Sequence, residues 1–380
     1  MKQVLVLGGT GAMGKPLVDQ LSSDASVYVT TRRKASSVEN KENIKYLTGN
    51  AKDLSFLREV LSLYRWDAVV DFMVWGKEFQ EVASMMLEAT GQYVFISSAR
   101  VYAEVDGLIT ETSPRLLDVS NDTEYLKTNE YALSKAREED ILLNSGKKNF
   151  TIVRPTITYN RNRVQLGVLE KENWLYRALH GRSIVFSKDI ADKVTTMTYG
   201  KDVANGIACI VGKEGAKGEI YHITCPQFLL WSDVLEIYLR ELEVYLGKRP
   251  RVVMTEKSTN LKFKERVYQV IYCRYFNRAF DNSKVAKYCN INNFKQPKEG
   301  LSECLQQFLE RPQFGEIDWI LEAVNDRVAG ERTPLSEIGS RANKMYYIVY
   351  RYRLQFLLPV IKTAGQLHGR VVRMLRKLTE

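Results

Sequence analysis

Hydrophobic positions alternate between two spacings along the first 160 residues. Short apolar runs, typical of strands buried in a sheet, occur at 3–8, 26–31, 44–50, 67–75, 93–102 and 150–159. Between them lie segments whose apolar residues recur every three or four positions, as in amphipathic helices, at 15–23, 53–64, 78–90 and 131–144. Strands that alternate with helices in this way predict a parallel sheet covered by helices on both faces.

The first apolar run ends in three glycines, Gly8, Gly11 and Gly14, directly before the first helical segment. Glycine has no Cβ, so the chain can turn sharply there and a ligand can approach the backbone amides closely. The N-terminus of the following helix offers free N–H groups and a positive dipole end to a phosphate. A strand, a glycine turn and a helix in this order predict dinucleotide binding, with an ordinary glycine-rich turn as the alternative.

The second apolar run ends in Thr31, Arg32 and Arg33. An acidic residue at this point would bind the adenosine ribose hydroxyls of NAD. Arginines in its place favour the 2′-phosphate of NADP, because a guanidinium pairs well with phosphate oxygens. The alternative is a solvated basic loop, which leaves NAD open as the cofactor.

Two further motifs supply groups for proton transfer. Tyr131 and Lys135 are four positions apart in a helical segment, so they share one face. A lysine there can stabilise a phenolate and hold the cofactor ribose, and the tyrosine can then exchange a proton with a substrate oxygen. Ser98 ends the fifth apolar run, and the carboxyl ends of parallel strands face the cofactor crevice. We therefore expect Ser98, Tyr131 and Lys135 to be the catalytic residues.

Later segments complete the expected fold. Strand-like runs occur at 194–200 and 219–224, and the segments around them show neither a clear helical nor a clear strand spacing of apolar residues. We expect an α/β protein with a Rossmann-type doubly wound parallel sheet, a smaller discontinuous C-terminal substrate domain and a helical basic extension. The expected boundaries are 1–160 for the dinucleotide-binding domain, with 195–225 returning to it, 161–194 and 226–310 for the substrate-binding domain, and 311–380 for the extension.

These motifs resemble those of the extended short-chain dehydrogenases/reductases, in the NAD-dependent epimerase/dehydratase family. The similarity spans about residues 1–310 and rests on GGTGAMG, ISSARVY, YALSK, VRPTITY, TMTYGKDVANGI and NSKVAKYCNINNFKQPKEGLSECLQQFL. It implies that the three glycines hold the cofactor pyrophosphate. It also implies that Ser98 polarises the substrate oxygen, that Tyr131 is the acid/base and that Lys135 supports it. The hydride chemistry itself belongs to the cofactor.

The resemblance also implies further contacts with the cofactor and the substrate. Pro155 and Thr156 stand where the family packs against the nicotinamide, and Asn50 replaces an aspartate usual near the adenine. The full set of expected cofactor-binding residues is Gly8, Thr10, Gly11, Ala12, Met13, Gly14, Thr31, Arg32, Arg33, Asn50, Ala51, Phe72, Pro155 and Thr156. For the substrate we expect Arg100, Asn160 and Arg161, and Tyr159 and Arg163 of the same loop could also position a diphosphate, because arginine matches phosphate oxygens. An exposed basic loop is the alternative for residues 159–163.

Departures from the family pattern narrow the range of reactions that we expect. The Asp-Glu pair that dehydratases carry after the serine is here Ala99 and Arg100, which disfavours 4,6-dehydration. The expected reaction is therefore NAD(P)-dependent 4-epimerisation or 4-keto reduction of a nucleotide sugar. The segments DAVVDFMVW and GQYVFISSARVY also resemble a divergent subgroup that includes chloroplast stem-loop RNA-binding proteins. A non-catalytic role in RNA binding or complex assembly stays open for that reason.

Composition changes this picture mainly at the C-terminus. The formal charge is +10, and residues 341–380 carry nine bases and one acid, so the rest of the chain is close to neutral. Nucleic-acid binding by the main domain is therefore not expected. The five cysteines are scattered, which suggests neither a disulfide framework nor a metal site. The scattered cysteines and an N-terminus that lacks the layout of a signal peptide together favour a cytoplasmic location.

The basic tail has a helical pattern of its own. From Met345 to Leu378, apolar residues recur in steps of three or four, and Pro359 is expected to kink or divide this stripe. The stripe predicts packing on the protein's own body or on a second subunit of a homodimer, or peripheral contact with the inner face of an anionic membrane. The apolar run 354–361 is far shorter than the roughly 20 residues of a membrane span.

Overall fold

The large sheet of this protein is parallel throughout. The computed structural model describes residues 2–33, 42–261 and 264–359. Within these ranges seven strands pair in the order β11-β6-β5-β4-β1-β2-β3. They are β1 (Lys2–Leu7), β2 (Ala25–Thr31), β3 (Ile44–Thr48), β4 (Ala68–Asp71), β5 (Tyr93–Ile96), β6 (Phe150–Pro155) and β11 (Glu219–Ile223). The order reverses between β1 and β4, and their carboxyl ends border the crevice in which such sheets bind ligands.

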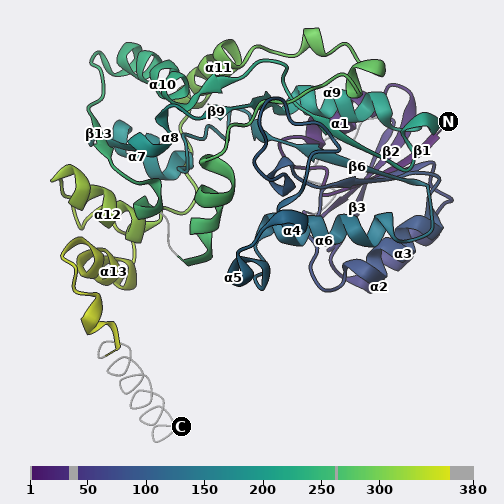
Figure 1. The fold of residues 1–380 in the computed structure, drawn as a ribbon, viewed down its shortest axis with the longest axis horizontal. Coiled ribbons are helices and arrows are strands. Elements are labelled where there is room, and N and C mark those ends of the chain that lie inside the picture. The colour runs from purple at the N-terminus through teal and green to yellow at the C-terminus, as the bar shows by residue number, and fades with distance from the viewer. Residues whose placement is uncertain (1, 34–41, 262–263, 360–380) are drawn as a thin grey trace, which may run out of the picture.

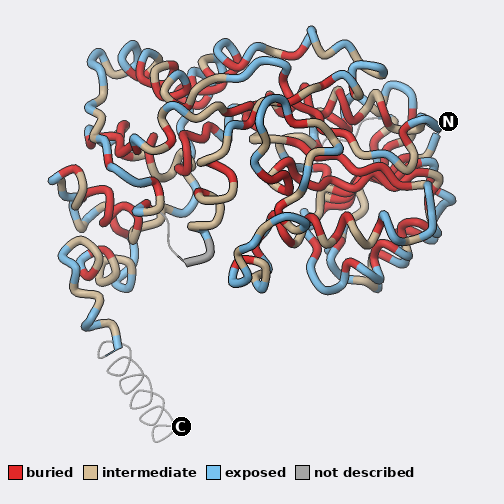
Figure 2. Tube along the Cα trace, in the orientation of Figure 1, coloured by how far each residue is buried: buried red, intermediate tan, exposed pale blue. Residues whose placement is uncertain are grey.

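Helices cover both faces of this sheet, as the alternating pattern predicts (Figure 1). One face packs against α2 (Leu54–Ser62), α3 (Phe79–Ala89) and α6 (Tyr131–Leu143). The other face packs against α1 (Gly14–Leu21) and α9 (Gly200–Ile210). The central strands β4, β5 and β6 are buried throughout, while the edge strand β3 is mostly half-buried or exposed (Figure 2). The expectation of an α/β fold with a Rossmann-type doubly wound sheet is confirmed.

Two strands end earlier than their hydrophobic runs predict. The run 93–102 forms β5 only to Ile96, and a 3₁₀ helix at Ala99–Val101 follows, capped by Ser98. The run 150–159 breaks at Thr156 into β6 and β7 (Ile157–Tyr159), and β7 pairs with β10 (Met197–Tyr199) instead of continuing the large sheet. Pro155 has no N–H to donate to the sheet, which favours the break. Both breaks leave the chain at the carboxyl edge, beside the crevice.

A second hydrophobic core lies beside the sheet and draws on stretches of chain on both sides of α9 and β11. Its main helices are α7 (Lys171–Leu179), α10 (Trp231–Leu246) and α11 (Pro297–Leu309). Short strand pairs frame it, β8 (Ile184–Ser187) with β13 (Val252–Thr255) and β9 (Val194–Thr195) with β12 (Leu229–Leu230). Further short helices are α4 (Leu116–Val119), α5 (Thr123–Leu126) and α8 (Lys188–Ala191).

The C-terminal extension docks on this second core through buried charges. Leu321 and Val324 of α12 (Trp319–Ala329) join the core. Arg177 of α7 lies 2.8 Å from carboxylate oxygens of both Glu322 and Asp326. The helix α13 (Arg341–Arg351) then packs on α12, and the Tyr347 hydroxyl donates a hydrogen bond to Asp326. The helices α12 and α13 of the extension are therefore bound to the protein's own body.

The apolar stripe expected from Met345 onward does not form one helix. The helix α13 ends at Arg351, and Arg353 has a φ of 58°, so the helix stops before Pro359 is reached. Tyr352 and Phe356 of the stripe are exposed. Its remainder, from Val360 to Leu378, lies outside the described residues. None of the helices within the described ranges combines the length and the apolar character that crossing a bilayer requires.

Candidate active site

Close backbone contacts shape the glycine turn between β1 and α1. Gly8 has a φ of 72°, a conformation that glycine adopts without strain. A Cβ on Gly14 would lie 2.6 Å from the Cα of Gly9, so α1 begins in direct contact with the turn. A Cβ on Gly11 would meet only the carbonyl oxygen of Gly8, at 3.9 Å. Gly8 and Gly14 are therefore required by the fold, while Gly11 leaves open space for a ligand.

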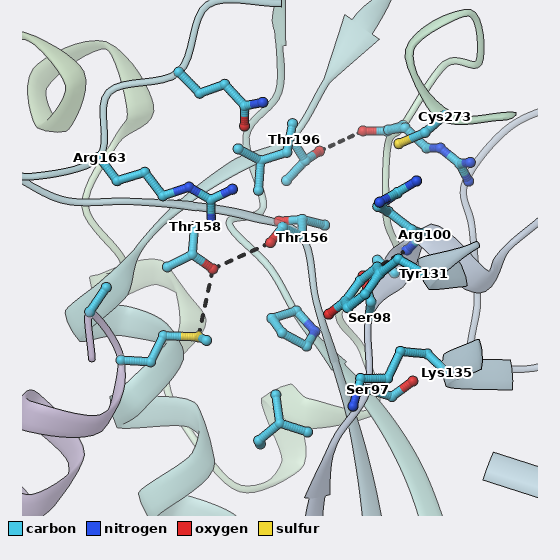
Figure 3. Close-up of a pocket in the computed structure, with 18 of the residues that line it drawn as sticks. Ser97, Ser98, Arg100, Tyr131, Lys135, Thr156, Thr158, Arg163, Thr196 and Cys273 are labelled. Atoms are coloured by element: carbon cyan, nitrogen blue, oxygen red, sulfur yellow. Dashed lines mark hydrogen bonds between the residues drawn. The ribbon is translucent and has the colours of Figure 1, made fainter. Parts of the chain in front are cut away.

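The turn forms part of a cavity of about 490 Å³ between the large sheet and the second core (Figure 3). Sequence segments more than 100 residues apart meet at this cavity. Twelve of the expected site residues line it: Gly8, Gly11, Ala12, Met13, Gly14, Phe72, Ser98, Arg100, Tyr131, Lys135, Pro155 and Thr156.

The expected adenosine contacts lie outside this lining. Thr31 is buried at the end of β2, and the exposed Arg32 and Arg33 follow it. The Arg33 amide donates a hydrogen bond to the Thr31 hydroxyl at 3.1 Å. Asn50 is exposed and Ala51 is buried in the turn between β3 and α2, and Thr10 is exposed in the glycine turn. Their contacts with a cofactor stay predictions.

The loop after β7 presents one of its candidate residues, Arg163, to the cavity. Asn160 and Arg161 do not belong to the lining, and Arg161 is exposed. The backbones of Asn160 and Arg163 exchange two hydrogen bonds, which makes a tight turn. Arg163 lines the cavity instead, and its guanidinium lies 3.5 Å from the carboxylate of Glu170.

Ser98 and Tyr131 lie along the same wall of the cavity (Figure 3). The Ser98 hydroxyl accepts a hydrogen bond from the Arg100 amide at 3.2 Å, and this contact leaves its own hydrogen available to donate. Tyr131 begins α6 and is 37% exposed. The Arg100 guanidinium lies 5.3 Å from the centre of its ring and pairs with Glu130, the residue that caps α6. A hydrogen-bond donor and a proton-exchanging phenol therefore face one space.

Lys135 lies deeper than Tyr131. Its ammonium is 2.9 Å from the Glu138 carboxylate and 4.4 Å from the centre of the Phe95 ring. Burial raises the pKa of the Glu138 carboxyl, and the charge of Lys135 opposes this in part. Neither contact is with Tyr131, so the expected support of the phenol by Lys135 stays a prediction.

Sequence reasoning missed a buried aspartate beside the cavity. Asp71 ends β4 and accepts hydrogen bonds from the Trp75 indole at 2.6 Å, the Tyr93 hydroxyl at 2.7 Å and the Met73 amide at 2.8 Å. Burial raises its pKa, and the bond from Trp75 opposes this most strongly. Asp71 thus fixes the turn that presents Phe72 and Met73 to the cavity. A charged residue in the middle of the apolar run 67–75 was the available signal.

Sequence reasoning also missed the wall contributed by residues 269–280. Cys273, Arg274 and Arg278 line the cavity from the side of the second core. The Arg274 guanidinium donates to the Cys273 sulfur at 3.0 Å. The segment carries no motif, so the sequence held no signal that would have placed these residues beside Tyr131.

A profile of the NAD dependent epimerase/dehydratase family matches residues 4–224, which include the glycine turn, Ser98 and Tyr131. The chain belongs to this family. Among its curated relatives is the chloroplast stem-loop binding protein of 41 kDa b from Arabidopsis thaliana, 25% identical over 248 residues. The match covers 61% of this chain and 61% of that relative, so less than two thirds of the relative is spanned.

Solved structures of NAD-dependent epimerases and dehydratases share the fold. The Bordetella bronchiseptica enzyme WbmH, in complex with NAD+, has a TM-score of 0.61 and 16% identity, over 82% of this chain and all of that one. UDP-glucuronic acid 4-epimerase from Bacillus cereus, in complex with UDP-glucuronic acid and NAD, has a TM-score of 0.60 and 17% identity, over 82% and 100% of the chains. For dTDP-glucose 4,6-dehydratase from Bacillus anthracis, in complex with NAD, the values are 0.59 and 17%, over 82% and 97%. At these identities the likeness shows the fold.

Proposed function

We propose that this member of the epimerase/dehydratase family is an NAD(P)-dependent enzyme that epimerises or reduces a nucleotide sugar at its 4-position. The observation that carries the proposal is the meeting of the glycine turn, Ser98 and Tyr131 in one cavity. A binding module would need the glycine turn alone. A hydroxyl donor and a phenol placed beside it are the groups that carbonyl and alcohol chemistry requires.

The residues of the turn fit a dinucleotide. The open space beside Gly11 lets a pyrophosphate approach the backbone at the N-terminus of α1, where the helix dipole favours an anion. Pro155 and Thr156 line the same cavity and are available to contact the nicotinamide. When bound, the cofactor supplies the hydride acceptor or donor.

Two side chains, Ser98 and Tyr131, act on the oxygen of the reacting carbon. Ser98 donates a hydrogen bond to the oxygen of the reacting carbon, and Tyr131 gives or takes the proton of that oxygen. Ala99 is buried in the 3₁₀ helix and Arg100 pairs with Glu130, so the positions of the dehydratase acid and base hold neither group. This arrangement supports epimerisation or reduction over elimination of water.

We further propose a preference for NADP. Arg32 and Arg33 are exposed at the end of β2, where a ribose 2′-phosphate would lie in a dinucleotide bound to the turn. Two guanidinium groups provide paired donors for such a phosphate. The solved structures named above contain NAD, so this preference is a property proposed for this chain.

A second candidate function is nucleic-acid binding, favoured by the name of the Arabidopsis relative and by the basic residues 341–380. It predicts an affinity for stem-loop RNA that falls steeply with salt and is lost when residues 341–380 are deleted. Substitution of Ser98 would leave this affinity unchanged.

Mass spectrometry of ligands carried by the purified full chain, followed by a panel of nucleotide sugars, tests the proposal. Conversion of a sugar without net cofactor consumption indicates epimerisation, and consumption of NADPH with a 4-keto sugar indicates reduction. Absence of bound dinucleotide together with salt-sensitive RNA affinity would overturn the enzymatic proposal in favour of the second candidate.

A further inference from the structure

Three arginines gather around Cys273 at the Tyr131 end of the cavity. Arg274 and Arg278 are 3% and 7% exposed, and both line the cavity together with Arg100. Arg278 donates hydrogen bonds to the carbonyl oxygens of Tyr102 and Ala103, which follow Arg100 closely along the chain. Cys273 and Arg100 lie next to each other above Tyr131 in Figure 3. The cluster is therefore compact and belongs to the catalytic end of the cavity.

The cluster has more positive charge than its protein surroundings neutralise. Arg100 pairs with Glu130, but within the described ranges neither Arg274 nor Arg278 has a carboxylate at ion-pair distance. Arg274 bonds to the Gly167 carbonyl and to Cys273, and Arg278 bonds to carbonyl oxygens. Burial lowers the pKa of both guanidinium groups. Buried charges without counter-ions are costly, so a fold that keeps two of them beside a cavity is arranged for an anion.

Polar atoms at the cluster are also left without hydrogen-bond partners. The Nε atoms of Arg100 and Arg278 are buried and have no acceptor among the described residues. The Oε1 atom of Gln165, on the same cavity and 2% exposed, has no donor. A ligand with both an acidic group and a hydroxyl would satisfy these atoms together.

The position of the cluster indicates which part of a ligand would carry the negative charge. The pyrophosphate of a cofactor belongs at the glycine turn, where α1 begins. The arginines lie instead beside Tyr131, whose ring centre is 5.3 Å from the Arg100 guanidinium. The anionic group therefore sits close to the oxygen whose proton Tyr131 exchanges.

We propose that Arg100, Arg274 and Arg278 form a subsite for a carboxylate on the reacting sugar, so that the substrate is an acidic sugar of the uronic acid type. The proposal rests on the proposed function, which it makes more specific. A neutral hexose would leave the two buried guanidinium groups without a counter-ion. A uronic acid places a carboxylate on the carbon next to position 4 of the ring, within reach of both Tyr131 and the arginines.

Cys273 provides a reporter inside the subsite. Burial alone would raise the pKa of its thiol, but the charges of Arg274, Arg278 and Arg100 outweigh burial and lower it. The Cys273 sulfur accepts a hydrogen bond from Arg274 and therefore lies in direct contact with the subsite. Its alkylation by a small anionic reagent measures the attraction of the subsite for anions.

The first experiment compares iodoacetate with the neutral iodoacetamide on the full chain, with the modified peptides quantified by mass spectrometry. Cys209, half-buried and outside the cavity lining, is the internal reference. We expect the rate ratio of iodoacetate to iodoacetamide to be about tenfold higher at Cys273 than at Cys209, since two extra charges act at short range. Arg278→Gln should remove most of this difference. The control Arg249→Gln changes the net charge equally at a surface ion pair and should leave it intact.

The second experiment uses the wild-type chain alone and competes the labelling of Cys273 with two matched pairs of ligands. Glucuronate and UDP-glucuronic acid should slow the reaction several-fold, while glucose and UDP-glucose should not. Equal protection by UDP-glucose and UDP-glucuronic acid would overturn the proposal, because the arginines would then hold the diphosphate. Absence of protection by any acid would overturn it as well. Protection by glucuronate without protection by UDP-glucuronic acid would support the subsite and overturn the nucleotide-sugar function, so the two failures are distinguishable.

Discussion

The ammonium of Lys135 and the carboxylate of Glu138 lie 2.9 Å apart, three residues apart on α6, and both side chains are almost wholly buried. The YxxxK spacing that marks a catalytic lysine therefore coincides with a buried ion pair. Within the described residues, the lysine that is expected to serve the cofactor and Tyr131 is held by a neighbour on its own helix. The carboxylate of Glu138 therefore compensates the buried charge of Lys135.

Glu138→Gln should lower the free energy of unfolding by about 3–5 kcal/mol, because it leaves the ammonium of Lys135 buried without a partner. Urea denaturation measures this loss. Combining Glu138→Leu with Lys135→Met should recover most of it, since no charge is then buried. Glu81→Gln, at the exposed pair with Arg58, is the matched control and should cost at most about 1 kcal/mol. Equal losses at both positions would show that the burial of the pair is energetically irrelevant.

Gly14→Ala and Gly11→Ala should separate folding from cofactor binding. The first variant places a Cβ against the Cα of Gly9 at 2.6 Å, and we expect destabilisation of about 1–3 kcal/mol from overpacking. The second has room in the free protein, so its melting temperature should stay close to that of the wild type while its affinity for NAD(P) falls. Thermal melts and fluorescence titration of NADH supply the two measurements. Unchanged affinity in Gly11→Ala would place the pyrophosphate elsewhere.

Tyr131→Phe should lower kcat by a factor of about 10²–10⁴, the usual contribution of a general acid/base. The variant keeps the ring and its contact with Arg100, so the affinity for the dinucleotide should not change. Turnover is measured with the substrate found in the panel, and binding by titration calorimetry. A Tyr131→Phe enzyme that retains full turnover would contradict the assigned mechanism.

Replacing both Arg32 and Arg33 by alanine should weaken NADPH binding by about tenfold or more while NADH binding changes little, because charge-assisted contacts with the 2′-phosphate would be lost. Arg65→Ala, another exposed arginine of the same domain, serves as the control for net charge. The readout is the ratio of the two dissociation constants. A ratio that stays at its wild-type value in the double variant rules out a role of these arginines in cofactor choice.

The docking of the C-terminal extension should weaken in acid. Burial would raise the pKa of Asp326, but its hydrogen bond from Tyr347 and its contacts with Arg177 outweigh this and lower it. A carboxyl whose folded pKa is depressed stabilises the protein above its unfolded pKa of about 3.9, and this stability is lost as the pH falls through the lower folded value.

Unfolding followed by tryptophan fluorescence between pH 7 and pH 3 checks this. Burial raises the pKa of the neighbouring Glu322, so its effect on the pH dependence of stability has the opposite sign. Comparison with Asp326→Asn therefore isolates the contribution of Asp326. The variant should be less stable at pH 7 and should lose less stability on acidification. Parallel curves for the two proteins would exclude Asp326 as the source of acid sensitivity.

The sequence predicted the parts of this protein whose signals are local. Buried strands, amphipathic helices and the glycine turn each depend on neighbouring residues, and those expected within residues 1–160 all formed, whereas the single helix expected from Met345 did not. The strand after Tyr93 stops at Ile96 because Ser98 caps a turn, a preference that the apolar run conceals. Arg274 and Arg278 could not be placed, because their position beside Tyr131 depends on how the second core packs against the sheet. In the loop after β7, a tight turn brings Arg163 to the cavity and leaves Arg161, another candidate from the same loop, exposed.

Gly200, the first residue of α9, packs directly against the glycine turn. This contact affects when the turn can be completed during synthesis. A Cβ on Gly200 would lie 2.9 Å from the carbonyl oxygen of Ala12, so the two backbones touch across nearly half of the chain. During synthesis from the N-terminus, residues 8–14 leave the ribosome long before their support at residue 200 exists. The cofactor turn therefore gains this backbone contact only after α7 and β8 have been translated, although residues 8–14 are synthesised well before them.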